Sequence, residues 1–165
     1  MMNYYQQMKR IIVLFFSIIF LLNCSSPKNA KSARIGIRTL PNYFANNTVS
    51  LQDEYNFKVI NSNTDFDKTF GIPKTAENNH LKPDFSSQLV VAVIMKPTNK
   101  KTNLRFDKAE IIGSDLNVYY LVHETGNHLN YTTSPTAVAT VPKSQSVKKV
   151  NFITRDKIEG SESVK

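Results

Sequence analysis

The side chains best suited to metal or acid–base chemistry gather in residues 123–128, which read HETGNH. A zinc protease helix needs two histidines four residues apart, so that both face one metal ion with a glutamate beside them. Here His123 and His128 are five residues apart, which turns them off a common helical face, and Gly126 disfavours a helix. The pattern therefore predicts a strand end and a loop, with no metal site and no cofactor.

Patterns typical of other catalytic sites are missing from the sequence. It has no Gly-x-Ser-x-Gly nucleophile motif, and Ser134, which precedes a proline, is better explained as a turn residue. The acidic pair Asp53 and Glu54 is better explained as two surface groups than as a general acid and base. The five glycines are scattered and form no phosphate-binding loop. We therefore predict that the chain is not an enzyme.

The first part of the chain carries a targeting pattern. Residues 11–22 read IIVLFFSIIFLL, without a charge, and directly follow Lys9 and Arg10. A basic segment followed by about 7–15 apolar residues is typical of a secretory signal peptide, because such a run is shorter than the roughly 20 residues that span a bilayer. A buried amphipathic helix would need polar residues along one face, which this segment lacks. We therefore predict that the chain is secreted.

The only cysteine, Cys24, directly follows this signal. Residues 21–24, LLNC, resemble a lipobox, the signal for lipid attachment in bacterial lipoproteins, although Asn23 stands where Gly, Ala or Ser is usual. The resemblance implies that residues 1–23 are a lipoprotein signal peptide, and that a lipidated Cys24 holds the chain on a lipid bilayer. The candidate start codons are Met1, Met2 and Met8.

Residues 24–33 predict a flexible tether, because after the cysteine they are small, polar and basic with no apolar periodicity. No acidic residue directly follows Cys24, as it would in an inner-membrane retention signal, and no acidic cluster resembles a surface-export signal. We therefore expect the protein at the outer membrane, facing the periplasm, with the cell surface as the second location. The sequence after Cys24 has no cysteine, so the mature domain can form no internal disulfide.

The charge of the chain is moderately basic. It has 21 basic and 13 acidic residues, a formal charge of +8, and removing Lys9 and Arg10 with the signal peptide leaves 19 basic and 13 acidic residues, or +6. A basic protein can bind nucleic acid, but secretion removes that partner, and no stacking aromatic residues alternate with the lysines. We therefore expect no nucleic-acid partner. A solvated basic face and contact with an acidic protein or anionic lipid are the two interpretations left.

The remaining sequence predicts a single β-rich domain, residues 34–157, followed by a disordered tail, residues 158–165. Residues 89–95 read LVVAVIM, apolar on both faces and rich in β-branched side chains, which is typical of a central strand covered on both sides. Alternating apolar residues on either side of Gly113 predict a β-hairpin. Leu104 and Phe106 have one alternation phase and Ala109 and Ile111 have the other, so a bulge near residues 107–108 would place all four on one face of the strand.

One segment favours a helix. Thr64 and Asp67 have the spacing of a capping box, and Phe66 and Phe70 lie four residues apart on one helical face. Strands otherwise dominate the pattern. The predicted fold is therefore mostly β, a small antiparallel β-sandwich or barrel-like sheet with one short α-helix at about residues 64–70.

Two segments carry a resemblance to a known family. Residues 84–93 read DFSSQLVVAV and residues 132–144 read TTSPTAVATVPKS. Together with the order of elements over about residues 57–153, they resemble the PrcB C-terminal domain family of bacterial envelope lipoproteins, named for a subunit of a protease complex. The resemblance implies a β-rich, non-catalytic domain that binds a partner. The chain departs from the family at residues 98–101, TNKK, where Thr-Gly-Gly-Tyr is typical, so this loop cannot easily take the same positive-φ conformations.

Two functions from different classes remain. The first is a non-catalytic binding module whose sheet edge, or whose loops at residues 97–103 and 124–135, bind another envelope protein, with a protease as one candidate. Its binding residues in the first loop are Asn99, Lys100 and Lys101. A variant is direct protease inhibition by the turn at residues 97–98. The alternative is a periplasmic lipoprotein that binds a small ligand or glycan in a pocket lined by Tyr119, His123, His128 and Tyr131.

Overall fold

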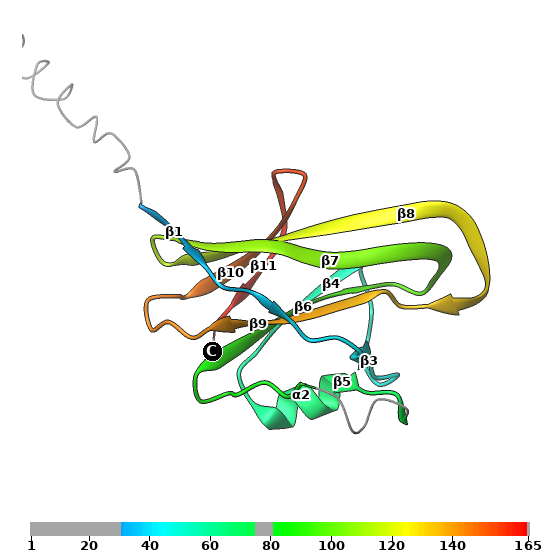
Figure 1. Cartoon of the computed structure of the whole chain (residues 1–165), viewed down its shortest axis with the longest axis horizontal. Helices are drawn as coiled ribbons and strands as arrows, with labels where there is room; N and C mark the ends of the chain where they lie inside the picture. Colours follow the sequence, from blue (N-terminus) through cyan, green and yellow to red (C-terminus); the bar gives the residue numbers. More distant parts are fainter. Residues whose placement is uncertain (1–30, 75–80, 165) are drawn as a thin grey trace, which may run out of the picture. The chain divides into compact units, whose positions relative to one another are not determined.

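The structure is a computed structural model that describes residues 31–74 and 81–164. The predicted signal peptide, Cys24 and most of the predicted tether lie outside the described residues. The described domain is mostly β with one short helix and two main sheets packed face to face (Figure 1), so the predicted fold class is confirmed.

The described elements are β1 (Ser32–Ile35), β2 (Arg38–Thr39), β3 (Phe44–Ala45), β4 (Tyr55–Ile60), α2 (Asn63–Thr69), β5 (Phe70–Gly71), β6 (Gln88–Met95), β7 (Thr98–Ile112), β8 (Asp115–Thr133), β9 (Thr136–Pro142), β10 (Lys149–Thr154) and β11 (Lys157–Ser163). They form a five-stranded sheet in the order β1-β7-β8-β10-β11, a four-stranded sheet in the order β2-β9-β6-β4, and the short pair of β3 and β5. The pairs are antiparallel except that of β8 with β10, which is parallel.

One long hairpin, residues 88–142, builds the centre of both sheets. Its inner half is the β6–β9 pair of the four-stranded sheet, and its outer half is the β7–β8 pair of the five-stranded sheet. The two arms change sheet beside Pro97 and Pro135, next to a hydrogen bond of 2.9 Å from the Met95 N–H to the Pro135 carbonyl. Proline suits such a bend because it fixes φ and donates no ladder hydrogen bond.

The turn and the bulge of the outer half lie where the sequence predicts them. Gly113 has a left-handed φ of +64°, which glycine adopts without steric cost. The register shifts between Phe106 and Lys108, and this bulge lets both Phe106 and Ala109 face the core.

The central strand β6 is buried on both faces, as residues 89–95 predict. Its odd-numbered side chains pack between the two sheets, and its even-numbered side chains pack against α2. The core between the sheets includes Leu89, Val91, Val93, Val118, Tyr120, Val150 and Phe152. The second core includes Ile60, Phe66, Phe70, Val90, Ala92 and Ile94. The helix therefore forms a third layer, on the outer face of the four-stranded sheet.

The predicted helix is confirmed, but the predicted capping residues Thr64 and Asp67 are wrong. The N-cap is Ser62, whose hydroxyl accepts a hydrogen bond from the Asp65 N–H at 3.2 Å and donates one to the Asp65 carboxylate at 2.8 Å. Both pairs have the spacing of a capping box. Ser62 lies two residues after Ile60, the last residue of β4, so the helix begins almost directly after the strand.

Four segments predicted to be irregular are strands instead. Residues 98–103 of the predicted loop 97–103 lie in β7. Residues 158–165, the predicted disordered tail, lie mostly in β11, which pairs with β10. Residues 124–135, predicted as a loop, lie mostly in β8. Ser32 and Ala33 of the predicted tether pair with β7. In each case a neighbouring strand supplies backbone hydrogen bonds, which apolar periodicity does not report.

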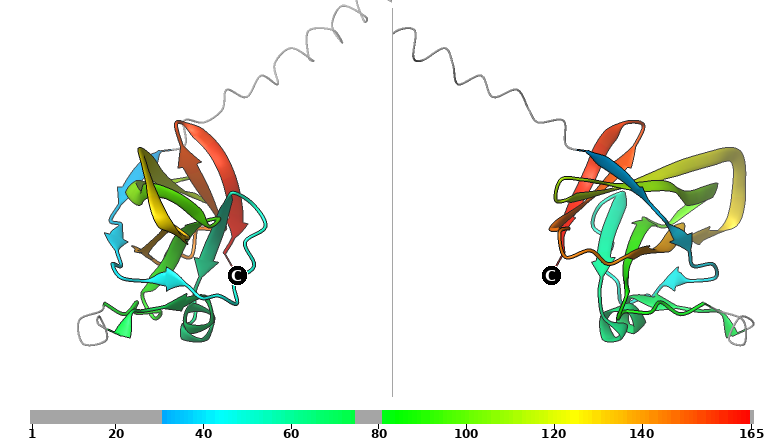
Figure 2. Two further views of the ribbon diagram at one scale, coloured as in Figure 1. Left: turned by 90° about the vertical axis from the view of Figure 1, so that its right-hand side faces the viewer. Right: turned by 60° about the vertical axis from the view of Figure 1, so that its left-hand side comes forward.

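The two sides of the sandwich are closed in different ways (Figure 2). On one side the chain crosses from β1 to β2 through Gly36 and Ile37, so that one segment covers an edge of each sheet. On the other side β4 and β11 are the edges of separate sheets, and the Phe57 ring of β4 lies against Gly160 of β11. On this second side no single segment runs from one sheet to the other, and β4 and β11 each end their sheet as an edge strand.

Candidate functional site

Most of the predicted binding residues lie at the start of β7 and the end of β8, far from the turn at Gly113 that joins the two strands. We call this the distal hairpin end, residues 98–102 of β7 and 124–133 of β8. Its register is irregular, because Thr102 lies opposite Glu124 but Lys100 lies opposite His128, so that a step of two residues in β7 matches a step of four in β8. Extra residues of this kind bend a strand and leave backbone groups unpaired. The distal hairpin end is an irregular, exposed extension of the sheet.

Two pairs of side chains meet across the distal hairpin end. Lys100 Nζ lies 3.0 Å from Glu124 Oε2, with 52% and 37% of the two side chains exposed. His128 Nδ1 lies 3.4 Å from Asn99 Oδ1. The hydrogen bond and the charge of Glu124 raise the pKa of Lys100 above its usual value. Because both contacts are exposed, they contribute little to stability, and their polar groups are accessible to a partner.

The seven predicted binding residues divide into two groups. Five lie at the distal hairpin end: Asn99, Lys100, Lys101, His128 and Tyr131. His123 lies at its base, opposite Asn103, and Tyr119 lies four residues earlier in β8, nearer the hairpin turn. The nine steps from Tyr119 to His128 correspond to roughly 30 Å of strand at about 3.3 Å per residue. The four side chains predicted to line a ligand pocket therefore do not converge on one point.

Tyr119 takes part in a separate polar network on the outer face of the five-stranded sheet. Its hydroxyl donates to Glu110 Oε1 at 2.5 Å, and Lys108 Nζ lies 4.1 Å from its ring centroid. The hydrogen bond to Glu110 raises the pKa of Tyr119 to about 12, and the same bond lowers the pKa of Glu110. The partners of Tyr119 thus lie within its own sheet, which indicates a structural role.

This network continues as a row of polar residues across all five strands. Arg34, Glu110, Asn117, Asn151 and Ser161 occupy successive register positions. Asn151 is only 3% exposed, and its side chain donates to Asn117 Oδ1 at 2.9 Å and accepts from the Ser161 hydroxyl at 2.7 Å. A buried amide with these partners favours the correct alignment of β8, β10 and β11. Its one sequence signal is a single Asn inside an otherwise apolar strand.

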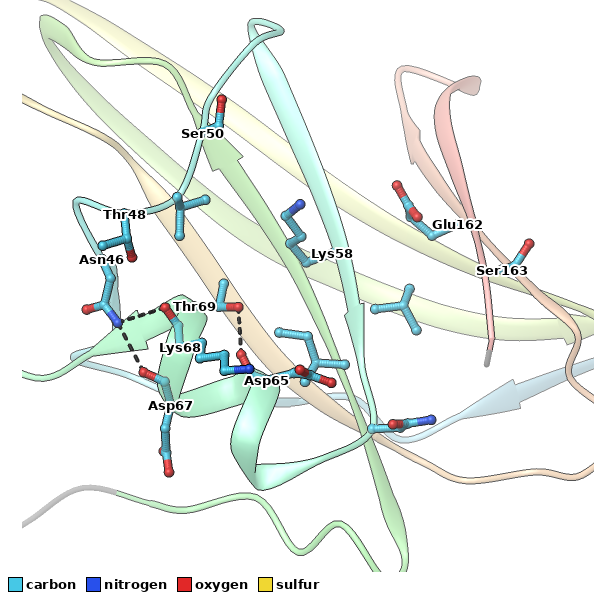
Figure 3. Close-up of a pocket in the computed structure, with 14 residues that line it drawn as sticks. Asn46, Thr48, Ser50, Lys58, Asp65, Asp67, Lys68, Thr69, Glu162 and Ser163 are labelled. Carbon is cyan, nitrogen blue, oxygen red and sulfur yellow. Dashed lines mark hydrogen bonds between the residues drawn. The ribbon is translucent and has the colours of Figure 1, made fainter.

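A second candidate site, which the sequence analysis missed, is a hollow of about 980 Å³ beside β4. We call it the edge groove (Figure 3). It lies between α2, residues 46–50, β4 and the end of β11. Its polar and charged lining residues include Thr48, Ser50, Lys58, Asp65, Asp67, Lys68, Thr69, Glu162 and Ser163. Its volume falls in the range of about 300–1,000 Å³ that is usual for ligand sites.

Hydrogen bonds hold one wall of the edge groove to the helix. Asn46 Nδ2 donates to the carbonyls of Asp67 and Lys68, at 3.1 Å each, and so ties the preceding loop to the end of α2 (Figure 3). Within the helix, Thr69 Oγ1 donates to the Asp65 carbonyl at 2.7 Å. The groove is therefore a built surface of mixed charge, suited to a ligand that forms many hydrogen bonds.

Within residues 31–74 and 81–164, no group of three His, Cys, Asp or Glu side chains could hold a metal ion. In the same described part of the chain, no helix is long and apolar enough to cross a membrane. No protein-family model, curated protein or solved structure matches the chain. The resemblance to the PrcB C-terminal domain family therefore stays a prediction, and the class that the structure defines is a small β-sandwich with one short helix.

Proposed function

We propose that this chain is a lipid-anchored protein of the bacterial envelope, which binds a partner protein through its distal hairpin end and catalyses no reaction itself. The observation that carries the proposal is the gathering of five predicted binding residues at one exposed end of the long hairpin. The signal pattern that ends at Cys24 supports the compartment.

The proposed anchor and the proposed binding end belong to opposite ends of β7. Ser32 of β1 pairs with Ile112, next to the hairpin turn, whereas the distal hairpin end contains the first residues of β7. The 15 residues of β7 span at most about 50 Å of strand. Seven residues, 25–31, separate Cys24 from β1, so a lipidated Cys24 would hold the start of β1 within about 25 Å of the bilayer.

The chemistry of the distal hairpin end fits a partner with an acidic surface. Lys100, Lys101 and His128 are exposed, and Tyr131 of the same hairpin end is 61% exposed. Aromatic side chains are frequent anchors of protein interfaces, and basic groups around them favour encounter with an acidic partner. An envelope protease is one candidate partner, because the resembled family is named for a subunit of a protease complex.

Fractionation of cells tests the anchor. The unchanged chain is expected in the membrane fraction, and the Cys24→Ser variant is expected in the soluble fraction, because it lacks the thiol that carries the lipid. Continued membrane association of the variant would refute the anchor.

Site-specific cross-linking tests the binding end. A photoreactive amino acid at Tyr131 is expected to cross-link an envelope protein in living cells. The matched control is the same probe at Ile158, which is similarly exposed at 54% but lies in β11. Equal cross-linking yields at the two positions, or no cross-link at either one, would refute binding through the distal hairpin end.

A further inference from the structure

The edge of β4 that faces away from β6 carries backbone groups that could bind a partner independently of the anchor and of the distal hairpin end. Within the described residues, β6 is the one strand that forms a hydrogen-bonded ladder with β4, while β11 lies against the Phe57 ring without pairing with β4. The Lys96 N–H donates to the Glu54 carbonyl at 3.0 Å. Because bonded pairs alternate along an antiparallel ladder, the even-numbered residues of β4 face β6. The backbone N–H and C=O groups of Tyr55, Phe57 and Val59 therefore point away from the sheet.

The hydrogen bonds between β6 and β9 agree with this assignment of the β4 backbone groups. The Met95 N–H donates to the Pro135 carbonyl, so the odd-numbered residues of β6 bond to β9 and the even-numbered ones are left for β4. Tyr55, Phe57 and Val59 carry one N–H and one C=O each, which gives six unpaired backbone groups at alternate positions. This spacing is what an additional β-strand requires.

β4 lacks the features that protect the edges of β2 and β11. Unpaired edges are usually kept short or charged, because they otherwise pair with another chain. β2 has only two residues, and β11 carries Lys157, Glu159 and Glu162. β4 is six residues long, reads YNFKVI and has one charge. Its composition therefore favours pairing.

The surroundings of β4 indicate which partner fits. The edge groove runs beside Lys58, Val59 and Ile60 and reaches Glu162 and Ser163 of β11. Residues 46–50 and α2 line the edge groove together with the end of β11. Its volume of about 980 Å³ is in the range of ligand sites, which suits a single extended peptide segment better than a second folded sandwich.

We propose that an extended segment of a partner polypeptide adds to β4 as a fifth strand of the four-stranded sheet. Successive side chains of an added strand face opposite sides of the sheet. One set would lie toward Phe57 and the apolar core between the sheets, and the other set toward the polar lining of the edge groove. The segment that fits best alternates apolar residues with hydroxyl-bearing or charged ones.

The first experiment selects displayed heptapeptides on the full chain in detergent micelles and then measures synthetic copies of the best binder. Two N-methylated forms of that peptide serve as matched probes, because they keep every side chain and block alternate N–H groups. Methylation in one phase is expected to weaken binding at least tenfold, and methylation in the other phase less than twofold. Equal effects in both phases, or a selection that yields no binder, would overturn the proposal.

The second experiment changes the edge itself. Val59→Pro removes an N–H that faces away from β6 and is expected to weaken peptide binding at least tenfold. The control is Thr39→Pro on edge strand β2. The Leu40 N–H donates to the Val138 carbonyl, so the Thr39 N–H also points away from its sheet. This variant is expected to bind the peptide within twofold of the unchanged chain. Binding that survives Val59→Pro would contradict the proposal. So would a dimer that this variant dissociates, because the edge would then belong to a second copy.

Discussion

The two halves of the long hairpin use the same pair of chain segments and differ in what covers them. In the inner half, β6 is buried along nearly its whole length and its register with β9 has no shift. In the outer half the register shifts at three places, and most side chains of the distal hairpin end are exposed. A large aliphatic side chain contributes about 1.5–3 kcal/mol when fully buried. One hairpin can thus combine a stable core with an adaptable end, because layers on both faces stabilise only the inner half.

The largest expected effect is in the inner half. Ile94 is fully buried between β6 and α2, so Ile94→Ala is expected to lower the free energy of unfolding by about 2–5 kcal/mol. The matched change at the distal hairpin end, Tyr131→Ala, is expected to stay within about 0.5 kcal/mol. Urea unfolding of both variants measures the difference. Equal losses would mean that the two halves do not differ in stability as burial predicts.

A smaller change in the free energy of unfolding, in the stabilising direction, is expected at Tyr120 in the core between the sheets. The Tyr120 hydroxyl is buried, and within the described chain it has no hydrogen-bond partner; burial accordingly raises the pKa of Tyr120. Leaving a buried hydroxyl unpaired costs about 1–3 kcal/mol, so Tyr120→Phe is expected to stabilise the fold by about 1 kcal/mol. Thermal or urea unfolding tests this, and a clear loss of stability would show that the hydroxyl has a partner.

The third prediction concerns pH on the outer face of the same strand. The pKa of Tyr119 rises from 10.0 to about 12 in the folded chain because its hydroxyl donates to Glu110. A raised folded-state pKa stabilises the fold below pH 10, and this stabilisation is lost as the pH rises through 10 toward 12. Urea unfolding between pH 8 and pH 12 should therefore show a smaller loss for Tyr119→Phe than for the unchanged chain. Parallel curves would contradict the role of this hydrogen bond.

The smallest effect is expected at the distal hairpin end. The ion pair of Lys100 and Glu124 is exposed, and exposed pairs are screened by solvent. A double-mutant cycle with Lys100→Ala and Glu124→Ala should give a coupling within the error of unfolding measurements. The same variants are expected to reduce cross-linking at Tyr131, since they alter the proposed binding surface. A strong coupling in unfolding would instead assign the pair to the stability of the fold.

Sequence reasoning succeeded where one physical signal dominated. Residues 89–95 predict a strand buried on both faces, because the apolar run has no polar phase. The bulge near residues 107–108 follows from a change of apolar phase within one strand. The exposed polar and basic character of residues 99–101 is also visible in the sequence, and the structure places them with His128.

The features that were missed depend on neighbours distant in the chain. β11 has little apolar periodicity, yet it forms because β10 offers a ladder and Asn151 bonds to Ser161. The edge groove brings together residues 46–50, α2 and Glu162, which no local pattern relates. The hydrogen bond of Lys96 to Glu54 determines which backbone groups of β4 point away from β6, so these groups too can be identified only once the strands are paired.

The parallel pairing of β8 with β10 imposes an order of assembly. Lys149 lies opposite Asp115, which is 149 − 115 = 34 residues earlier in the chain, and β9 of the other sheet lies between them in sequence. A hairpin can close progressively from its turn, whereas this pair must wait until the chain has passed through β9 and returned. Non-local pairings of this kind make folding slow. The C-terminal hairpin of β10 and β11 is therefore expected to join the five-stranded sheet only after the chain has passed through β9.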